Sequence, residues 1–176
     1  MIRISPLKPR PLPDKLIYVP TGSINDSIFF QQFKIFSTKT GDYGGFITLS
    51  KSEAYINGKM RPSLYIDHLF SARFGKGFGT ALLDFARTVS KKVGCEGRIH
   101  LCADGYFRPN AIPHVFYRRY GMNTGIEEID KVLDKFVQKR KNARYTDFSI
   151  VEMYYPPVTY EKTETIYRKS RNYLDW

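Results

Sequence analysis

Alternating apolar and polar positions divide the first half of the chain into short strands. Residues 27–36 are rich in Ile and Phe, residues 45–49 form a second apolar run, and together they predict a pair of antiparallel strands. The Gly-Asp-Tyr-Gly-Gly stretch at 41–45 is predicted to be the turn between them. A third run, at 63–70, follows an Asn57-Gly58 turn signal and predicts a central strand.

The spacing of apolar residues changes to that of a helix after residue 80. The apolar positions of this predicted amphipathic helix are Leu82, Phe85, Ala86, Val89 and Val93. Charged residues occupy its other faces, and Gly94 marks its end. Residues 98–103 then return as a strand, so the middle of the chain is predicted to be a strand-helix-strand unit with parallel strands and a right-handed crossover.

The second half of the chain predicts two more helices and one strand. A short helix over residues 111–120 is ended by Gly121, and the apolar positions from Ile126 to Val137 again have helical spacing. A strand at 148–155 follows and is closed by a pair of prolines. The order of elements therefore indicates a mixed α and β fold.

Length and composition are those of one globular domain. The chain has 176 residues, of which 42% are hydrophobic and 26% charged, and it contains no run of 18 apolar residues. We expect a single domain over residues 1–157 and a C-terminal arm over 158–176, packed on the domain or extending from it. The candidate anchors of this arm are Tyr160, Tyr167, Tyr173 and Trp176.

The net charge and the cysteines bear on the class of ligand and on the cellular compartment. Residues 1–13 lack the apolar core of a secretory signal, and we expect a cytoplasmic protein in which Cys95 and Cys102 are reduced structural thiols. The net charge of +11 favours a polyanionic ligand: a nucleotide cofactor, a nucleic acid or an acidic partner. The basic runs at 118–119 and 139–141 are interpreted as solvated helix surface.

A glycine-rich turn carries the most specific chemical signal. Residues 73–83 read Arg-Phe-Gly-Lys-Gly-Phe-Gly-Thr-Ala-Leu-Leu, between the central strand and the amphipathic helix. Gly75, Gly77 and Gly79 let the backbone approach a ligand closely, and the helix directs its N–H groups and its positive dipole end toward the turn. The segment predicts a phosphate-bearing cofactor.

Two known phosphate-binding turns fit the spacing less well. A mononucleotide P-loop requires Ser or Thr after Gly-Lys, whereas Gly77 follows Lys76. A dinucleotide fingerprint is closer, because Asp104 ends the next strand where a ribose-binding acid belongs, but its third glycine is missing, since Gly77 is followed by Phe78-Gly79-Thr80-Ala81. NAD therefore stays open as an alternative cofactor.

Residues 66–122 resemble the core of the GCN5-related N-acetyltransferase family. The segments that carry the resemblance are Ile-Asp-His-Leu-Phe at 66–70, the glycine turn and helix start at 75–83, the strand at 98–103, and Asn110 followed by Phe-Tyr-Arg-Arg-Tyr-Gly-Met at 116–122. Their order and spacing make the joint match more specific than any one piece. The resemblance implies a mixed, mostly antiparallel central sheet with one parallel strand pair and flanking helices.

The resemblance also implies acetyl-CoA as the co-substrate. Its pyrophosphate would lie on the backbone of Phe74, Gly75, Lys76, Gly77, Phe78, Gly79 and Thr80. Its pantetheine arm would pair with the backbone of Leu69, Phe70 and Ser71 and accept a hydrogen bond from Asn110. An amine on the acceptor would then attack the thioester directly.

The reaction needs one proton removed from the amine and one delivered to the thiolate. By the resemblance, Tyr117 is the acid, and the base is Asp67, His68 or an ordered water. Successive strand residues face opposite sides, so at most one of Asp67 and His68 points into an acceptor cleft. His114 lies one helical turn before Tyr117 and is expected on the surface, and no metal site is expected.

Some features depart from the family pattern or stay open. Phe74 stands where Gln or Arg usually begins the phosphate turn, and no pair of helices separates the first strands, so the helix over 126–140 or the C-terminal arm would form the substrate wall. The acceptor is open among small amines, peptide N-termini, protein lysines and aminoacyl-RNA. A basic domain that binds nucleic acid, with its Tyr and Phe side chains stacking on bases, is the alternative of a different class.

Overall fold

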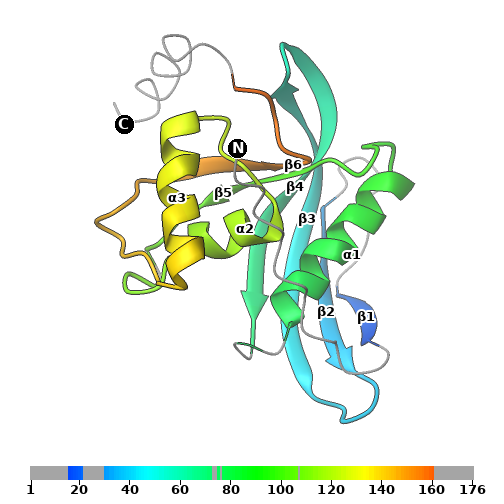
Figure 1. Ribbon diagram of the computed structural model, residues 1–176. Helices are drawn as coiled ribbons and strands as arrows, with labels where there is room; N and C mark the ends of the chain where they lie inside the picture. Colours follow the sequence, from blue (N-terminus) through cyan, green and yellow to red (C-terminus); the bar gives the residue numbers. More distant parts are fainter. Residues whose placement is uncertain (1–15, 22–29, 73–74, 76, 107, 161–176) are drawn as a thin grey trace. The chain divides into compact units, whose positions relative to one another are not determined.

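The computed structural model describes residues 16–21, 30–72, 75, 77–106 and 108–160 (Figure 1). The strands are β1 (Leu16–Thr21), β2 (Phe30–Ser37), β3 (Tyr43–Ile56), β4 (Lys59–Ser71), β5 (Ile99–Ala103) and β6 (Val151–Tyr155). The helices in these residues are α1 (Phe78–Lys92), α2 (His114–Tyr120) and α3 (Glu127–Lys139).

The strands form a six-stranded sheet in the order β1-β2-β3-β4-β5-β6. Neighbouring strands β1 and β2, and β2 and β3, pair in antiparallel fashion. Strands β4 and β5 are parallel: Leu64 faces Ile99 and Ile66 faces Leu101, with α1 as the crossover between them. The mixed, mostly antiparallel sheet with one parallel pair is therefore confirmed.

The turn before β3 lies earlier in the chain than the predicted turn at 41–45. The chain reverses over residues 38–42, where the Gly41 N–H donates to the Ser37 carbonyl, and Gly44 and Gly45 belong to β3 itself. A Cβ atom at Gly44 would overlap the Phe78 ring, and one at Gly45 would overlap the Phe70 carbonyl. These glycines serve close packing rather than the turn, and they allow the end of β4 to lie directly on β3.

Strand lengths also differ from expectation. The predicted run at 45–49 lies in the first half of the much longer β3, whose second half extends to the Asn57-Gly58 turn. Strand β1 was not predicted, although all of its residues pair with β2. Residues 16–19 of this strand are all apolar, but Pro20 and the proline-rich residues 1–13 obscured the strand pattern.

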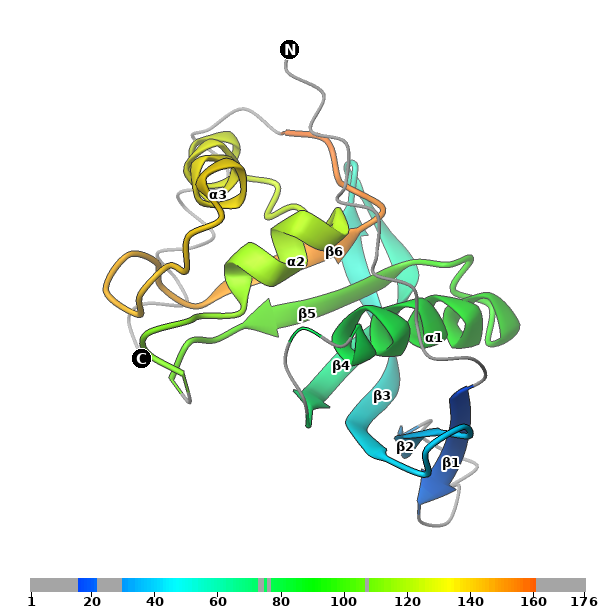
Figure 2. The ribbon, with the colours of Figure 1, turned by 60° about the horizontal axis from the view of Figure 1, so that its bottom comes forward.

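The chain divides into two compact units, and the first comprises residues 1–54 and 60–101. Helix α1 crosses the strands of this unit (Figure 2). Its Phe85 ring stacks on Tyr18, with ring centroids 4.0 Å apart, and meets Phe33 edge-on. The fully buried aliphatic side chains of this unit include Ile35, Ile47, Leu49, Leu64, Leu82 and Leu83. This packing fixes the position of the start of α1, which carries the glycine turn.

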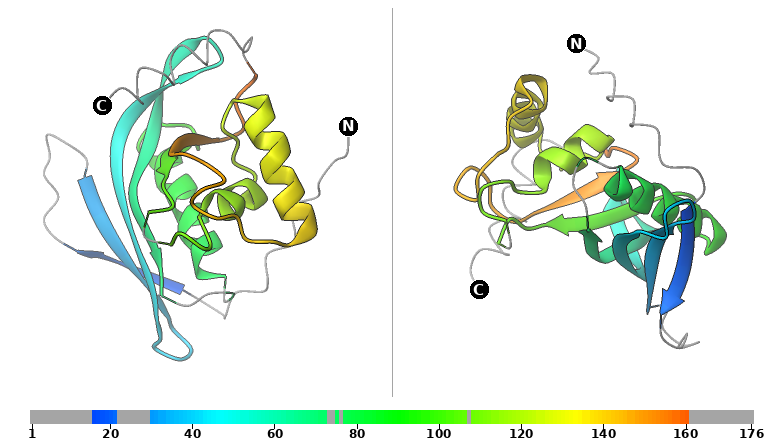
Figure 3. Two further views of the ribbon diagram at one scale, coloured as in Figure 1. Left: turned by 90° about the vertical axis from the view of Figure 1, so that its left-hand side faces the viewer. Right: turned by 90° about the horizontal axis from the view of Figure 1, so that it is seen from below.

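The second unit comprises residues 55–59 and 102–176, and α2 and α3 pack together in it (Figure 3). Helix α2 begins at His114, three residues later than predicted, because the Ile112 N–H is bound to the Ala143 carbonyl and Pro113 precedes the first turn. Gly121, with a φ of 115°, ends it as predicted. Among the described residues, no helix combines the length and apolar character needed to cross a membrane.

Candidate functional site

The glycine turn gives α1 an open N-terminus. Gly77 is the N-cap residue, with φ 82° and ψ 2°, and Gly75 also has a positive φ of 69°. The first bond of the helix runs from the Ala81 N–H to the Gly77 carbonyl, so the amides of residues 78–80 have no carbonyl within the helix to bind. No side chain caps this end, and its first turn contains no acidic residue.

This arrangement suits an anion, because N–H groups and the positive end of the helix dipole meet there without a carboxylate in the first turn of the helix. Phe78 does not obstruct the turn, since its side chain is 3% exposed and packs into the core beside Gly44. Gly79 and Thr80 are half-buried. The predictions for Phe74 and Lys76 lie outside the described residues.

The end of β4 presents the candidate bases on opposite faces. Asp67 is half-buried, and its Oδ2 accepts a hydrogen bond of 2.8 Å from the hydroxyl of Ser50 on β3, a partner that the sequence reasoning missed. His68 is exposed. Ser50 holds the Asp67 carboxylate in one orientation, and this order favours Asp67 as a base over the exposed imidazole.

Beyond the part of β4 that pairs with β5, the strand continues to Ser71. Leu69 and Ser71 are half-buried, and Phe70 is exposed with its ring tilted against Phe46. The Ala72 N–H donates to the Gly44 carbonyl, which ties this end to β3. The segment expected to pair with a pantetheine arm thus leads directly into the glycine turn.

Tyr117 belongs to the second unit, whereas the glycine turn and Asp67 belong to the first. It lies on α2 and is 8% exposed. Burial raises the pKa of this phenol, so it stays protonated at neutral pH.

Asn110 is exposed on the loop between β5 and α2. In the same loop, Asp104 follows β5 and its Oδ1 accepts a hydrogen bond from the Tyr106 N–H at 2.9 Å. Asp104 therefore caps its own loop in this structure. If NAD were bound, its ribose would share the Asp104 carboxylate with the Tyr106 N–H.

His114 is buried rather than on the surface, which corrects the expectation from its helical position. Its side chain is 0% exposed, stacks on Phe148, and its Nε2 lies 3.0 Å from the Ser149 carbonyl. That contact requires a proton on Nε2, and burial lowers the pKa of the ring despite opposing effects of Ser149 and Asp104. The buried Nδ1 has no partner among the described residues.

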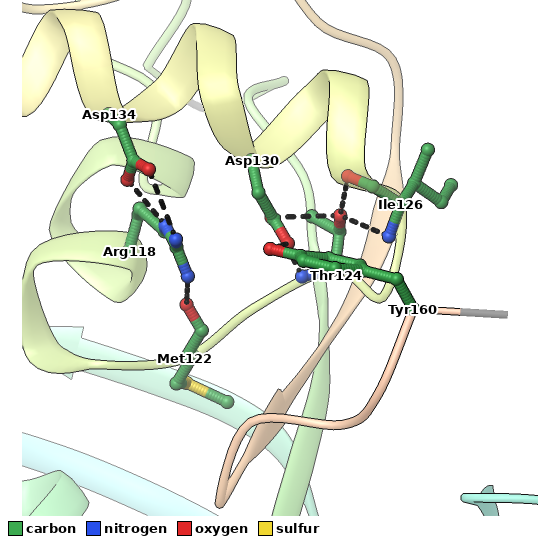
Figure 4. A network of polar contacts seen from close by, with 7 residues as sticks. All are labelled: Arg118, Met122, Thr124, Ile126, Asp130, Asp134 and Tyr160. Carbon is green, nitrogen blue, oxygen red and sulfur yellow. Dashed lines mark hydrogen bonds and ion pairs between the residues drawn. The ribbon is translucent and has the colours of Figure 1, made fainter. Parts of the chain in front are cut away.

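A polar network holds α2 against α3 (Figure 4). The guanidinium of Arg118, next to Tyr117, binds both oxygens of Asp134 at 2.7 and 3.2 Å and donates to the Met122 carbonyl. Arg118 was predicted to be solvated surface, but it is a clamp with only 19% of its side chain exposed. The neighbouring Arg119 is exposed, as expected.

The same network anchors the segment after β6. Asp130 is 1% exposed, and its oxygens accept hydrogen bonds from the N–H and hydroxyl of Thr124 and from the Tyr160 hydroxyl at 2.9 Å (Figure 4). Asn123 exchanges two hydrogen bonds with the backbone of Val158. Tyr160 thus acts as the anchor that its sequence position suggested, while Tyr167, Tyr173 and Trp176 lie outside the described residues.

Metal and thiol chemistry have little support in the described part of the chain. It contains no cluster of three or more His, Cys, Asp or Glu side chains that could hold a metal. Cys95 is buried and Cys102 exposed, and both are free thiols. Burial raises the pKa of each, which disfavours the reactive thiolate.

The chain has a structural likeness to solved structures. No protein-family model matches the chain, and no curated protein matches it significantly. Among solved structures, it is similar to a point mutant of the toxin AtaT, bound to the C-terminus of the antitoxin AtaR and acetyl-CoA. The TM-score is 0.38 and the identity 20%, and the match covers 53% of this chain and 59% of that chain, less than two thirds of its length.

Proposed function

We propose that this chain is an acetyl-CoA-dependent N-acyltransferase that moves an acetyl group to an amine by direct attack on the thioester. The observation that carries the proposal is the start of α1. There, a parallel strand-helix-strand unit presents uncapped amides behind Gly77, with no acidic residue in the first turn. This geometry supports the cofactor implied by the resemblance over residues 66–122.

In this proposal the chain holds the co-substrate mainly through backbone. The amides of residues 78–80 bind the pyrophosphate, and Gly75 and Gly77 keep side chains out of its way. The backbone of residues 69–71 pairs with the pantetheine arm. Asn110 contributes one further hydrogen bond, as the resemblance implies.

Two proton transfers then complete the reaction. Asp67, oriented by Ser50, removes a proton from the acceptor amine directly or through water. The amine nitrogen forms a bond to the acetyl carbon, and the bond from that carbon to sulfur breaks. Tyr117, which is protonated at neutral pH, donates its phenolic proton to the departing thiolate.

Calorimetric titration with acetyl-CoA and, in parallel, with NAD tests the proposal. Saturable binding of acetyl-CoA, lost in Gly77→Glu, supports it. Gly58→Glu is a matched control, since Gly58 has a φ of 83° and nothing within 4 Å of an added Cβ atom, far from the phosphate turn in sequence. Binding of NAD alone would instead favour the dinucleotide alternative, and binding of neither would overturn both.

The role of Tyr117 is tested by kinetics with a panel of amine acceptors. Tyr117→Phe keeps the packing of α2 and removes only the hydroxyl, so kcat is expected to fall about 10²-fold or more at an unchanged Kd for acetyl-CoA. An unchanged kcat would exclude Tyr117 as the acid without affecting the cofactor assignment. The neighbouring Tyr120→Phe is the control for loss of a phenol on the same helix.

A further inference from the structure

Two loops of the second unit lie side by side (Figures 2 and 3). The loop after β5 and the loop after α3 are joined by backbone hydrogen bonds from the Tyr145 N–H to the Pro109 carbonyl, at 2.7 Å, and from the Ile112 N–H to the Ala143 carbonyl, at 3.1 Å. We call the described residues 104–106, 108–112 and 139–147 the loop pair. The two bonds hold it as one continuous surface.

Two tyrosine rings of the loop pair face solvent. Tyr106 is 69% exposed and Tyr145 is 46% exposed. The Tyr145 ring lies against Gly105, where an added Cβ atom would be 3.3 Å from its Cδ2, so the two tyrosines come from directly adjacent backbone segments. Exposed aromatic rings on two adjacent segments offer flat faces to a ligand.

The charge around these rings is strongly positive. The exposed basic residues of the loop pair are Arg108, Lys139, Arg140, Lys141 and Arg144. Its acidic residues are Asp104 and Asp147, and each accepts a hydrogen bond from a backbone N–H of its own loop, Tyr106 and Arg144 respectively. The carboxylates are thereby committed to loop geometry, while the basic residues of the loop pair are all exposed.

We propose that the loop pair is a binding surface for single-stranded nucleic acid. Arginine and lysine side chains neutralise backbone phosphates, and exposed rings stack on bases that are not already stacked in a duplex. An acidic peptide would satisfy the charges but would leave both rings without a flat partner. The surface is independent of the proposed acetyl transfer, since it uses none of the residues assigned to catalysis or to the phosphate turn.

Fluorescence anisotropy with a labelled single-stranded RNA of about 12 nucleotides, a length within the range of known single-strand sites, tests the proposal on the full chain. The charge variant is Arg140→Glu with Arg144→Glu, and the ring variant is Tyr106→Ala with Tyr145→Ala. The control variant, Lys39→Glu with Lys92→Glu, makes the same change in net charge at exposed positions of the first unit. Circular dichroism and thermal melts verify that each variant is folded.

The charge variant and the ring variant are expected to differ in how the salt concentration affects their RNA binding. Each lost phosphate contact lowers the slope of log K against log salt by about 0.7, so the charge variant should bind at least tenfold more weakly with a slope reduced by about 1.4. The ring variant should lose at least about fivefold per ring at an unchanged slope. The control should bind within about twofold of the wild type.

The proposal is overturned if the wild-type chain does not bind the RNA, or if the control variant loses as much affinity as the charge variant. It is also overturned if the ring variant binds normally, or if polyglutamate or a duplex of the same length competes as well as the single strand. Acetyl-CoA binding is measured on the same variants and should be unchanged, so that this surface and the proposed enzyme activity fail or succeed separately.

Discussion

Helices α1 and α3 begin in opposite ways. Helix α1 starts at a left-handed glycine with no capping side chain and no acid in its first turn. Helix α3 starts with three acidic residues, Glu127, Glu128 and Asp130, and the Thr124 hydroxyl accepts a hydrogen bond from the Ile126 N–H just before it. One N-terminus is satisfied by the chain itself, and the other leaves its amides and dipole for something else.

The start of α3 contributes to stability, whereas the start of α1 is suited to binding. Carboxylates in the first turn stabilise α3 by interacting with its dipole, and Asp130 also ties the helix to its neighbours. At α1 the corresponding positions hold Phe78, Gly79 and Ala81, which provide no negative charge. A helix start that lacks these stabilising features within a well-packed unit is a place where an external anion can supply them.

The largest expected effect comes from giving α1 a carboxylate of its own. In Thr80→Glu the new charge lies in the first turn, where two like charges about 4 Å apart repel by about 4 kcal/mol at an effective dielectric of 20, so acetyl-CoA binding should fall by about three orders of magnitude. The unfolding free energy should stay level or rise, because the helix dipole favours the carboxylate. Thr88→Glu, exposed further along α1, is the control.

Calorimetry and urea unfolding measure both quantities on the same samples. Undiminished acetyl-CoA binding in Thr80→Glu would contradict an anion site at this helix start. A large loss of stability in the same variant would mean that α1 tolerates no first-turn charge, and the comparison with α3 would fail.

The second-largest expected effect concerns α3, whose N-terminal groups bind other groups of the chain. Asp130→Ala removes the acceptor of both Thr124 donors and of the Tyr160 hydroxyl, and leaving buried donors unsatisfied is expected to lower the unfolding free energy by about 2–3 kcal/mol. Asp130→Asn keeps one acceptor oxygen and should cost less than half as much. Urea denaturation compares the two, and equal losses would show that charge rather than hydrogen bonding matters there.

The third effect is a pH dependence from α2. Burial lowers the pKa of His114 below 6.5, so the unfolded chain binds its proton more readily. The stability contribution of neutral His114 is complete above that value and is lost as pH falls toward the folded pKa, at no more than about 1.4 kcal/mol per pH unit. His114→Gln, which can still donate to the Ser149 carbonyl, should remove this part of the slope. Urea titrations between pH 7.5 and 5.5 measure it, and identical slopes would refute it.

The smallest effect is at the surface of α3. Glu127 forms an exposed ion pair with Lys131, at 3.0 Å, and it also lies at the positive end of the helix dipole. Glu127→Gln should lower the unfolding free energy by about 0.5 kcal/mol, and less in high salt. Thermal melts at low and high salt test this, and a loss that does not depend on salt would point to packing rather than charge.

Local sequence signals predicted β4, α1 and β5 in the middle of the chain, but not β1 or the full length of β3. The glycine turn, the apolar period of α1 and the two parallel strands are short-range patterns, and the structure has all of them. Gly44 and Gly45 were misassigned because their role depends on Phe78 and Phe70, which are distant in sequence. Nothing within a few residues of Gly44 indicates which ring will pack on it.

The polar interior of the second unit was far less predictable. Arg118 and His114 occupy positions that a helix projection marks as surface, and their burial is decided by Asp134 and Ser149, which lie 16 and 35 residues away. The same holds for Ser50, which orients Asp67 across neighbouring strands. Sequence patterns identify candidate groups, whereas long-range pairs decide which of them are buried and oriented.

Amide hydrogen exchange with and without acetyl-CoA tests the proposed site most directly, because it reports on both helix starts at once. Acetyl-CoA should slow exchange at residues 78–80, in the first turn of α1, and leave the first turn of α3 unchanged. Protection confined to other segments, or equal protection of both helices, would contradict an acetyl-CoA site built on the glycine turn.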